Sequence, residues 1–211
     1  MKVSKANHNI LLVGVPVVGH DALSSPRGYQ SCKVRNQKTC IMDPSLGSKD
    51  ILGPWPTGTV IHTDIVRHPG AVLVVPVLEC GKLVMIHNHR IAIGKPLLEF
   101  CAGKLEPGED PAAAAIRELE EECGYHAETL TPIGWFYTSP GFTDEKIYLF
   151  EARNLRRVNQ RLQPDEEIEV IELQLADIQS ALDSSELCDG KSIAALSIWR
   201  ARRQGEGHID E

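Results

Sequence analysis

The sequence predicts an α/β fold, with helices packed on both sides of a mixed β-sheet and a β-rich extension in front. Three observations support this. Short apolar or alternating segments, typical of strands, recur along the chain; one strongly helical stretch interrupts them at 111–123; and two further helical segments follow near the end. With 211 residues, 42% of them hydrophobic, the chain can bury a real core.

The expected strands end at Gly or Pro, or at polar clusters. Two of them, 70–78 and 82–89, read as a hairpin that turns at residues 79–81. Helices are expected at 175–183 and 191–204. The full set of expected strands is 29–42, 58–67, 70–78, 82–89, 96–100, 133–139, 145–153 and 167–174.

Composition excludes several functions. The net charge of -7 argues against a protein that binds nucleic-acid phosphates over a broad basic face, although a small anionic ligand needs only a local positive site. The longest apolar run, 10–18, is too short to cross a bilayer. Six cysteines without zinc-type spacing indicate free thiols, so we expect a cytoplasmic protein with no membrane partner.

The stretch GKLEPGEDPAAAAIRELEEECGY (103–125) carries the chemistry. Asp110 suits a helix cap, Pro111 the first helical position and Gly124 the end of the helix. At about 100° per residue, the carboxylates at 118, 121 and 122 share one face of this helix, while the one at 120 points elsewhere. Since only Arg117 offers a basic partner, a bound magnesium or manganese ion is expected to offset their repulsion.

Residues 103–125 resemble the Nudix box. Only Tyr125 departs from the motif, because a bulky aliphatic residue is usual there. The resemblance implies the Nudix fold and metal-dependent hydrolysis of a nucleoside diphosphate linked to another group. The positions in register are Gly103, Glu109, Arg117, Glu118, Leu119, Glu121, Glu122 and Gly124.

The resemblance also implies roles. Glu118, Glu121 and Glu122 would bind Mg²⁺, with Mn²⁺ as an alternative, and the Ala102 carbonyl would join them. Arg117 would pair with a further carboxylate, that of Glu109, behind these ligands.

Outside the box, residues 66–152 look like the branch of the family that acts on ADP-ribose and other nucleoside diphosphate sugars. The segment SPGFTDE (139–145) supports this, with Pro140 sixteen residues after Gly124. Two departures from the branch are Asn88-His89-Arg90 and Cys101. The implied substrate-binding residues are Arg67 and Arg90 for the diphosphate or terminal ribose, Glu99 and Glu145 for sugar hydroxyls, and the Pro140-Gly141 turn.

Each of these residues also has a simpler interpretation. An arginine such as Arg67 or Arg90 is often just a surface ion-pair partner, and Glu145 could merely begin a strand. In the acidic segment LQPDEEIEV (162–170), the branch implies a general base, for which Glu166 aligns best and Glu167 next. Such a loop could equally be only solvated.

The expected organisation is a β-rich segment at 1–66, used for dimerisation, and a Nudix hydrolase domain at 67–211. The branch implies a homodimer with an exchanged N-terminal sheet. The expected reaction splits ADP-ribose into AMP and ribose 5-phosphate. One alternative is another nucleotide sugar such as GDP-mannose. A more distant one, an ADP-ribose-sensing module, predicts a degraded box, whereas this box is intact.

Overall fold

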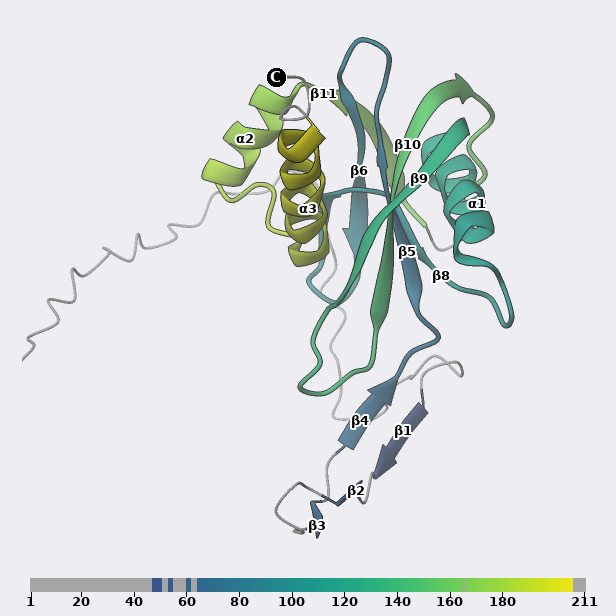
Figure 1. Cartoon of the computed structure of the whole chain (residues 1–211), viewed down its shortest axis with the longest axis vertical. Helices are drawn as coiled ribbons and strands as arrows, with labels where there is room; N and C mark the ends of the chain where they lie inside the picture. The colour runs from purple at the N-terminus through teal and green to yellow at the C-terminus, as the bar shows by residue number, and fades with distance from the viewer. Residues whose placement is uncertain (1–46, 51–52, 55–59, 62–63, 165, 207–211) are drawn as a thin grey trace, which may run out of the picture. The chain divides into compact units, whose positions relative to one another are not determined.

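In the computed structural model, the fold described below lies within the unit formed by residues 41–211 (Figure 1). The structure describes residues 47–50, 53–54, 60–61, 64–164 and 166–206. The strand expected at 29–42 lies outside these residues, as does most of the N-terminal segment.

Two sheets form the centre of this unit. The larger has the order β8 (Ala102–Lys104), β5 (Ala71–Pro76), β10 (Lys146–Arg157) and β9 (Tyr125–Tyr137). It is mixed, because β10 runs parallel to β5 while the other pairs are antiparallel. The smaller, antiparallel sheet has the order β11 (Ile168–Leu173), β6 (Leu83–Arg90) and β7 (Lys95–Glu99).

Two short antiparallel pairs precede these sheets. β1 (Gly47–Asp50) pairs with β4 (Asp64–Arg67), and β2 (Gly53–Pro54) pairs with β3 (Val60–Ile61). The strand predicted over 58–67 therefore corresponds to two short strands, β3 and β4.

The predicted hairpin of 70–78 and 82–89 is correct at its turn but wrong in its pairing. Leu78 N–H donates to the Lys82 carbonyl at 2.9 Å, and one bridge joins Val77 to Leu83. Beyond that bridge β5 and β6 enter different sheets. The reason is that β5 is buried along its whole length and both its edges already pair, with β8 and β10, so neither edge is free for β6.

Helices cover the two faces of the larger sheet, as predicted. α1 (Pro111–Cys123) lies on one side, and α2 (Leu175–Asp183) and α3 (Gly190–Glu206) lie on the other (Figure 1). Strand β5 alternates between the two layers. Leu73 packs in the cluster that contains Trp199 of α3, whereas Val72 packs in the cluster that contains Leu119 of α1.

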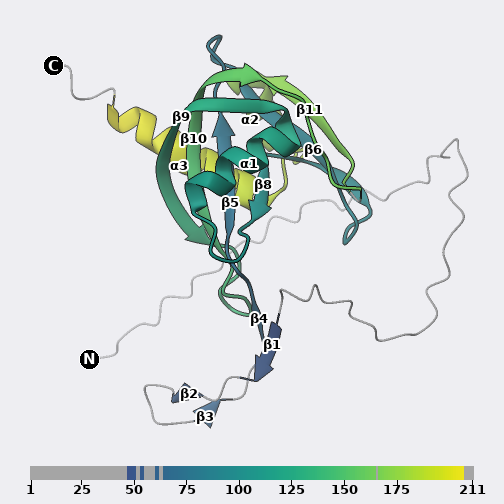
Figure 2. The same cartoon turned by 90° about the vertical axis from the view of Figure 1, so that its right-hand side faces the viewer.

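The helix α1, seen face-on in Figure 2, occupies the range predicted for it. Asp110 accepts hydrogen bonds from the backbone N–H groups of Ala112 and Ala113 at 2.9 and 3.2 Å. Gly124 ends the helix with φ 67°, a left-handed conformation that suits glycine. Strand β9 then begins at once, eight residues before the strand that was predicted at 133.

The remaining predicted helices are also present, as α2 and α3. The four cysteines in the described part of the chain, Cys80, Cys101, Cys123 and Cys188, are free thiols. Among the described residues no helix has the length and apolar character needed to span a membrane.

Candidate active site

Two of the three acids on the shared face of α1, Glu118 and Glu122, line a cavity of about 780 Å³, whereas Glu121 is not among its described lining residues. Its walls come from the end of β6, from β8 and the loop that follows, from α1 and from the loop before β11. The lining residues relevant to chemistry are Arg90, Ala102, Gly103, Arg117, Glu118, Glu122 and Glu166.

Glu118 lies unusually close to the backbone of β8. A Cβ atom added at Gly103 would meet the Glu118 carboxyl carbon at 1.9 Å, so only glycine leaves room for this side chain. The residue is 8% exposed, and burial raises the pKa of its carboxyl group while Arg117 opposes the shift. The first glycine of the box therefore has a steric role next to a candidate metal ligand.

Glu122 is the more deeply buried acid, at 4% exposed. Its Oε2 accepts a hydrogen bond from Ala102 N–H at 3.0 Å. Burial, followed by repulsion from Glu118, raises its pKa to about 8, and the Ala102 N–H and Arg90 only partly offset this. In the absence of a cation, then, Glu122 is predominantly protonated at neutral pH.

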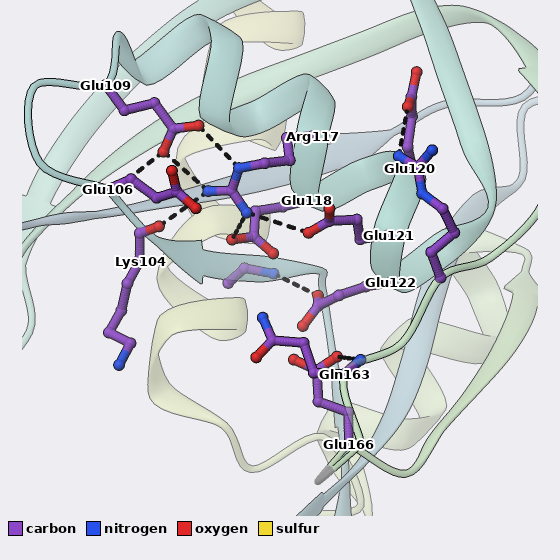
Figure 3. Close-up of polar contacts among 12 residues, drawn as sticks. Lys104, Glu106, Glu109, Arg117, Glu118, Glu120, Glu121, Glu122, Gln163 and Glu166 are labelled. Carbon is purple, nitrogen blue, oxygen red and sulfur yellow. Dashed lines mark hydrogen bonds and ion pairs between the residues drawn. The ribbon is translucent and has the colours of Figure 1, made fainter. Parts of the chain in front are cut away.

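Arg117 organises the acids around it (Figure 3). Its Nε and Nη2 contact the two carboxylate oxygens of Glu109, each at 2.9 Å, which is the pairing expected from the sequence. Its Nη1 lies 2.7 Å from Glu118 and 3.3 Å from Glu121. Arg117 also lowers the pKa of Glu109 through these hydrogen bonds.

Glu120 points away from this group, as predicted (Figure 3). It contacts His126 at 2.6 Å and Arg161 at 3.1 Å. Among the described residues, no three acids, histidines or cysteines are gathered closely enough to hold an ion as they stand. Instead, Arg117 Nη1 contacts the carboxylates of both Glu118 and Glu121.

Glu166 and its neighbour Glu167 lie on different cavities. Glu166 lines the cavity with Glu118 and Glu122, and its charge contributes to the raised pKa of both. Its Oε2 also accepts a hydrogen bond from Gln163 N–H at 2.8 Å. Glu167 lines a separate cavity of about 430 Å³ that includes His87. The geometry therefore favours Glu166 as the candidate base.

Arg90 and Glu99 form a close pair at the cavity. Arg90 Nε donates to one carboxylate oxygen of Glu99 at 2.8 Å, and Nη2 donates to the other at 2.5 Å. The Glu99 side chain is 1% exposed and also pairs with Lys191. Its oxygens thus already bind two cations, and Glu99 is not among the described residues that line the cavity, so its contact with sugar hydroxyls stays a prediction.

The other expected substrate contacts form a separate group. Arg67 Nη1 pairs with Asp144 at 2.7 Å, and Glu145 accepts a hydrogen bond from Thr138 Oγ1 at 2.7 Å. Pro140 and Gly141 lie in the same loop, between β9 and β10. None of these four candidates, Arg67, Pro140, Gly141 and Glu145, is among the described residues that line the cavity.

Residues 67–196 match the family model described as the NUDIX domain. The chain belongs to the Nudix family. Its relatives include the ADP-ribose pyrophosphatase of Bacillus subtilis (strain 168), 43% identical over 149 residues, which cover 70% of this chain and 80% of that protein. The methanol dehydrogenase activator of Bacillus methanolicus is 41% identical over 143 residues, 67% of this chain and 77% of that protein.

A GDP-mannose pyrophosphatase of Citrobacter koseri is 30% identical over 151 residues, which cover 64% of this chain and 78% of that protein. Among solved structures, the crystal structure of an ADP compounds hydrolase matches with a TM-score of 0.66 over 80% of this chain and 98% of that chain. At 21% sequence identity, this structural likeness supports the fold alone.

Several residues around this Nudix site carried no signal in the sequence. Lys191 contacts Glu99 although 92 positions separate them. Ser192 and Asp189 lie beside it, and Gln163 holds Glu166 through its backbone. They belong to no motif, so only the folded chain places them near the site.

Proposed function

We propose that this Nudix protein hydrolyses the diphosphate linkage of ADP-ribose to AMP and ribose 5-phosphate. The observation that carries the proposal is the arrangement of Glu118 and Glu122, which are buried next to Arg117 on one cavity that Glu166 also lines. The choice of substrate is supported by the relative named ADP-ribose pyrophosphatase, 43% identical over 149 residues.

The acids fit a hard divalent cation. Burial raises the pKa of Glu118 and Glu122, and a cation among them would favour the ionised forms. Carboxylate and carbonyl oxygens are the ligands that Mg²⁺ prefers, and Mn²⁺ takes a similar set. The proposed ligands are the Glu118, Glu121 and Glu122 carboxylates and the Ala102 carbonyl. Such an ion would replace the contact of Arg117 Nη1 with Glu118 and Glu121.

When bound, the ion would offset the charge of the diphosphate and lower the pKa of the attacking water. The residues of the chain have the remaining roles. Glu166 accepts a proton from that water while the water oxygen forms a bond to phosphorus. The bond from phosphorus to the bridging oxygen then breaks, and the two phosphate products separate. Arg90 binds the anionic diphosphate, for which a guanidinium is well suited.

The separate group at 139–145 has a proposed supporting role. Arg67 and Glu145, with the turn at Pro140 and Gly141, remain candidates for contacts with the terminal ribose. Substitution of Arg67 by Ala should raise KM for ADP-ribose while leaving hydrolysis of a smaller diphosphate unchanged. Equal effects on both substrates would assign Arg67 to its ion pair with Asp144.

A panel of nucleotide sugars tests the substrate. ADP-ribose, GDP-mannose and UDP-glucose are incubated with the protein and Mg²⁺, and the products are separated by chromatography. We expect the highest kcat/KM for ADP-ribose, with AMP and ribose 5-phosphate formed in equal amounts. A far lower value than for GDP-mannose would reject ADP-ribose in favour of the alternative suggested by the GDP-mannose pyrophosphatase relatives. Binding of ADP-ribose without turnover would instead support a sensing module.

We further propose a cytoplasmic homodimer in which residues 1–66 supply the exchanged sheet and residues 67–211 form the hydrolase domain. The support for this is the resemblance of the sequence to its branch of the family. Light scattering should give twice the monomer mass of 23.3 kDa for the whole chain. A monomeric whole chain would exclude the dimer, and recovery of the native protein from a membrane or secreted fraction would exclude the cytoplasmic location.

A further inference from the structure

A buried carboxylate connects Arg90, at the cavity, to helix α3. The Glu99 side chain is 1% exposed, and Arg90 engages it through Nε and Nη2, while Nη1 takes no part in the pair. On Oε2 of the same carboxylate, Lys191 Nζ donates at 2.6 Å. Glu99 is therefore held between an arginine of the site and a lysine of a distant helix.

The start of α3 fixes Lys191 in turn. Asp189 directly precedes the helix, and its Oδ2 accepts a hydrogen bond from the Ser192 backbone N–H at 3.0 Å, as a capping residue does. The same oxygen lies 2.9 Å from Lys191 Nζ. The ammonium group is thus bound on two sides and its side chain is 18% exposed, so its long stem has little freedom.

Ser192 links the same turn to the connection between β7 and β8, which leads to Ala102. Its side chain is fully buried; Oγ donates to Asp189 at 2.6 Å and accepts from Phe100 N–H at 2.9 Å. Phe100 lies two residues before Ala102, whose N–H holds Glu122 at 3.0 Å. One helical turn therefore contacts two consecutive residues, 99 and 100, that lead into the site.

We propose that residues 189–192, the capping residue and first turn of α3, position both halves of the active site. Lys191 acts through Glu99 to orient the Arg90 guanidinium toward the substrate diphosphate. Ser192 acts through Phe100 to fix the segment that presents Ala102 to the metal. Both are positioning residues, and the inference rests on the proposed function because it requires Arg90 to bind an anionic substrate.

The expected effects follow from what each contact supplies. Without Lys191, Arg90 is the only remaining cation on Glu99 among the described residues, so the carboxylate offsets more of the charge that Arg90 would offer the diphosphate. Without the Ser192 hydroxyl, the Phe100 N–H loses its acceptor inside the protein, and such a group is costly to leave unpaired. The first change weakens substrate binding, and the second weakens metal binding.

The test compares Lys191→Met and Ser192→Ala in the full chain, with ADP-ribose and Mg²⁺ varied independently. For Lys191→Met we expect KM for ADP-ribose to rise about tenfold, the range typical of residues that orient a ligand, with kcat changed much less. For Ser192→Ala we expect a several-fold weaker affinity for Mg²⁺, measured without substrate from the rise in melting temperature as Mg²⁺ is added. The Mg²⁺ concentration that gives half activity should rise by a similar factor, with KM at saturating Mg²⁺ nearly unchanged. Lys191→Arg should restore most of the lost affinity.

The control is Lys82→Met, in the turn between β5 and β6, because Lys82 is not among the described residues that line the cavity. Because Lys191→Met leaves a buried carboxylate with one cation, the double variant Glu99→Gln/Lys191→Met removes that charge as well. It should raise KM less than Lys191→Met alone, because no carboxylate charge then remains to offset that of Arg90. If the wild type hydrolyses no nucleotide sugar, the proposed function itself fails. If the wild type is active and Lys191→Met has the same KM as the control Lys82→Met, the positioning role of Lys191 is rejected. If Ser192→Ala keeps the wild-type Mg²⁺ requirement, the positioning role of Ser192 is rejected.

Discussion

Gly103 determines whether Glu118 can occupy its place. A Cβ atom at this position would lie 1.9 Å from the Glu118 carboxyl carbon, far inside any real contact. We therefore expect Gly103→Ala to displace the carboxylate and to lower activity about 10–100-fold, as for residues that orient metal ligands. Activity as a function of Mg²⁺ measures the effect.

A second variant separates this overlap from a general loss of fold. Glu118→Asp shortens the acid and withdraws its carboxylate from Gly103. Gly103→Ala should therefore destabilise the Glu118→Asp protein less than it destabilises the wild type, which is a coupling between neighbouring residues. Thermal unfolding of the wild type, the two single variants and the double variant measures this coupling. If the two changes in stability simply add, the Cβ atom at position 103 does not clash with Glu118.

At this scale the sequence predicted the residues that one helix brings together. Glu118 and Glu122 lie on one face, and Arg117 reaches back to Glu109, because helical geometry fixes their spacing. The sequence could not predict Lys191 near Glu99, since their contact depends on where α3 starts relative to β7. For the same reason the pairing of Glu99 with two cations, Arg90 and Lys191, was not predicted.

The segment before β11 places two adjacent acids on different cavities. We expect Glu166→Gln to lower kcat about 10²–10⁴-fold, the usual contribution of a general base, because Glu166 lines the cavity of Glu118 and Glu122. Glu167→Gln is the matched control, and its kcat should stay within a few-fold of wild type, because Glu167 lines the other cavity. Steady-state kinetics at saturating Mg²⁺ distinguishes the two, and the reverse order of effects would make Glu167 the base.

Among the larger elements, local patterns predicted the helices better than the strand pairing. The range of α1 follows from Asp110, Pro111 and Gly124, all of which act within a few residues of its ends. The pairing of β5 instead depends on β8 and β10, which lie far along the chain from it. A tight turn after β5 therefore predicted a hairpin that those partners prevent.

The site also makes the stability of the whole molecule depend on pH. The pKa of Glu122 is about 8 in the folded protein without metal, against an ordinary value of 4.5. Between these two values the folded state binds more protons than the unfolded state, so stability decreases as pH rises through this window. We expect the melting temperature of the metal-free protein to fall across this range, and Glu122→Gln to reduce the fall.

Magnesium should oppose this decrease in stability with rising pH, because it binds the ionised carboxylates and stabilises only the folded protein. At about 100 times its dissociation constant, a ligand adds roughly 2.7 kcal/mol to the free energy of unfolding. In a chain of this size that corresponds to a rise of several degrees in melting temperature. The increment should grow from about pH 6 to about pH 8, as fewer protons compete for Glu122. Differential scanning calorimetry with and without Mg²⁺ measures it, with Glu122→Gln as the control that should show a much smaller increment. An increment that is equal at both pH values, or undiminished in Glu122→Gln, would place the magnesium away from these carboxylates.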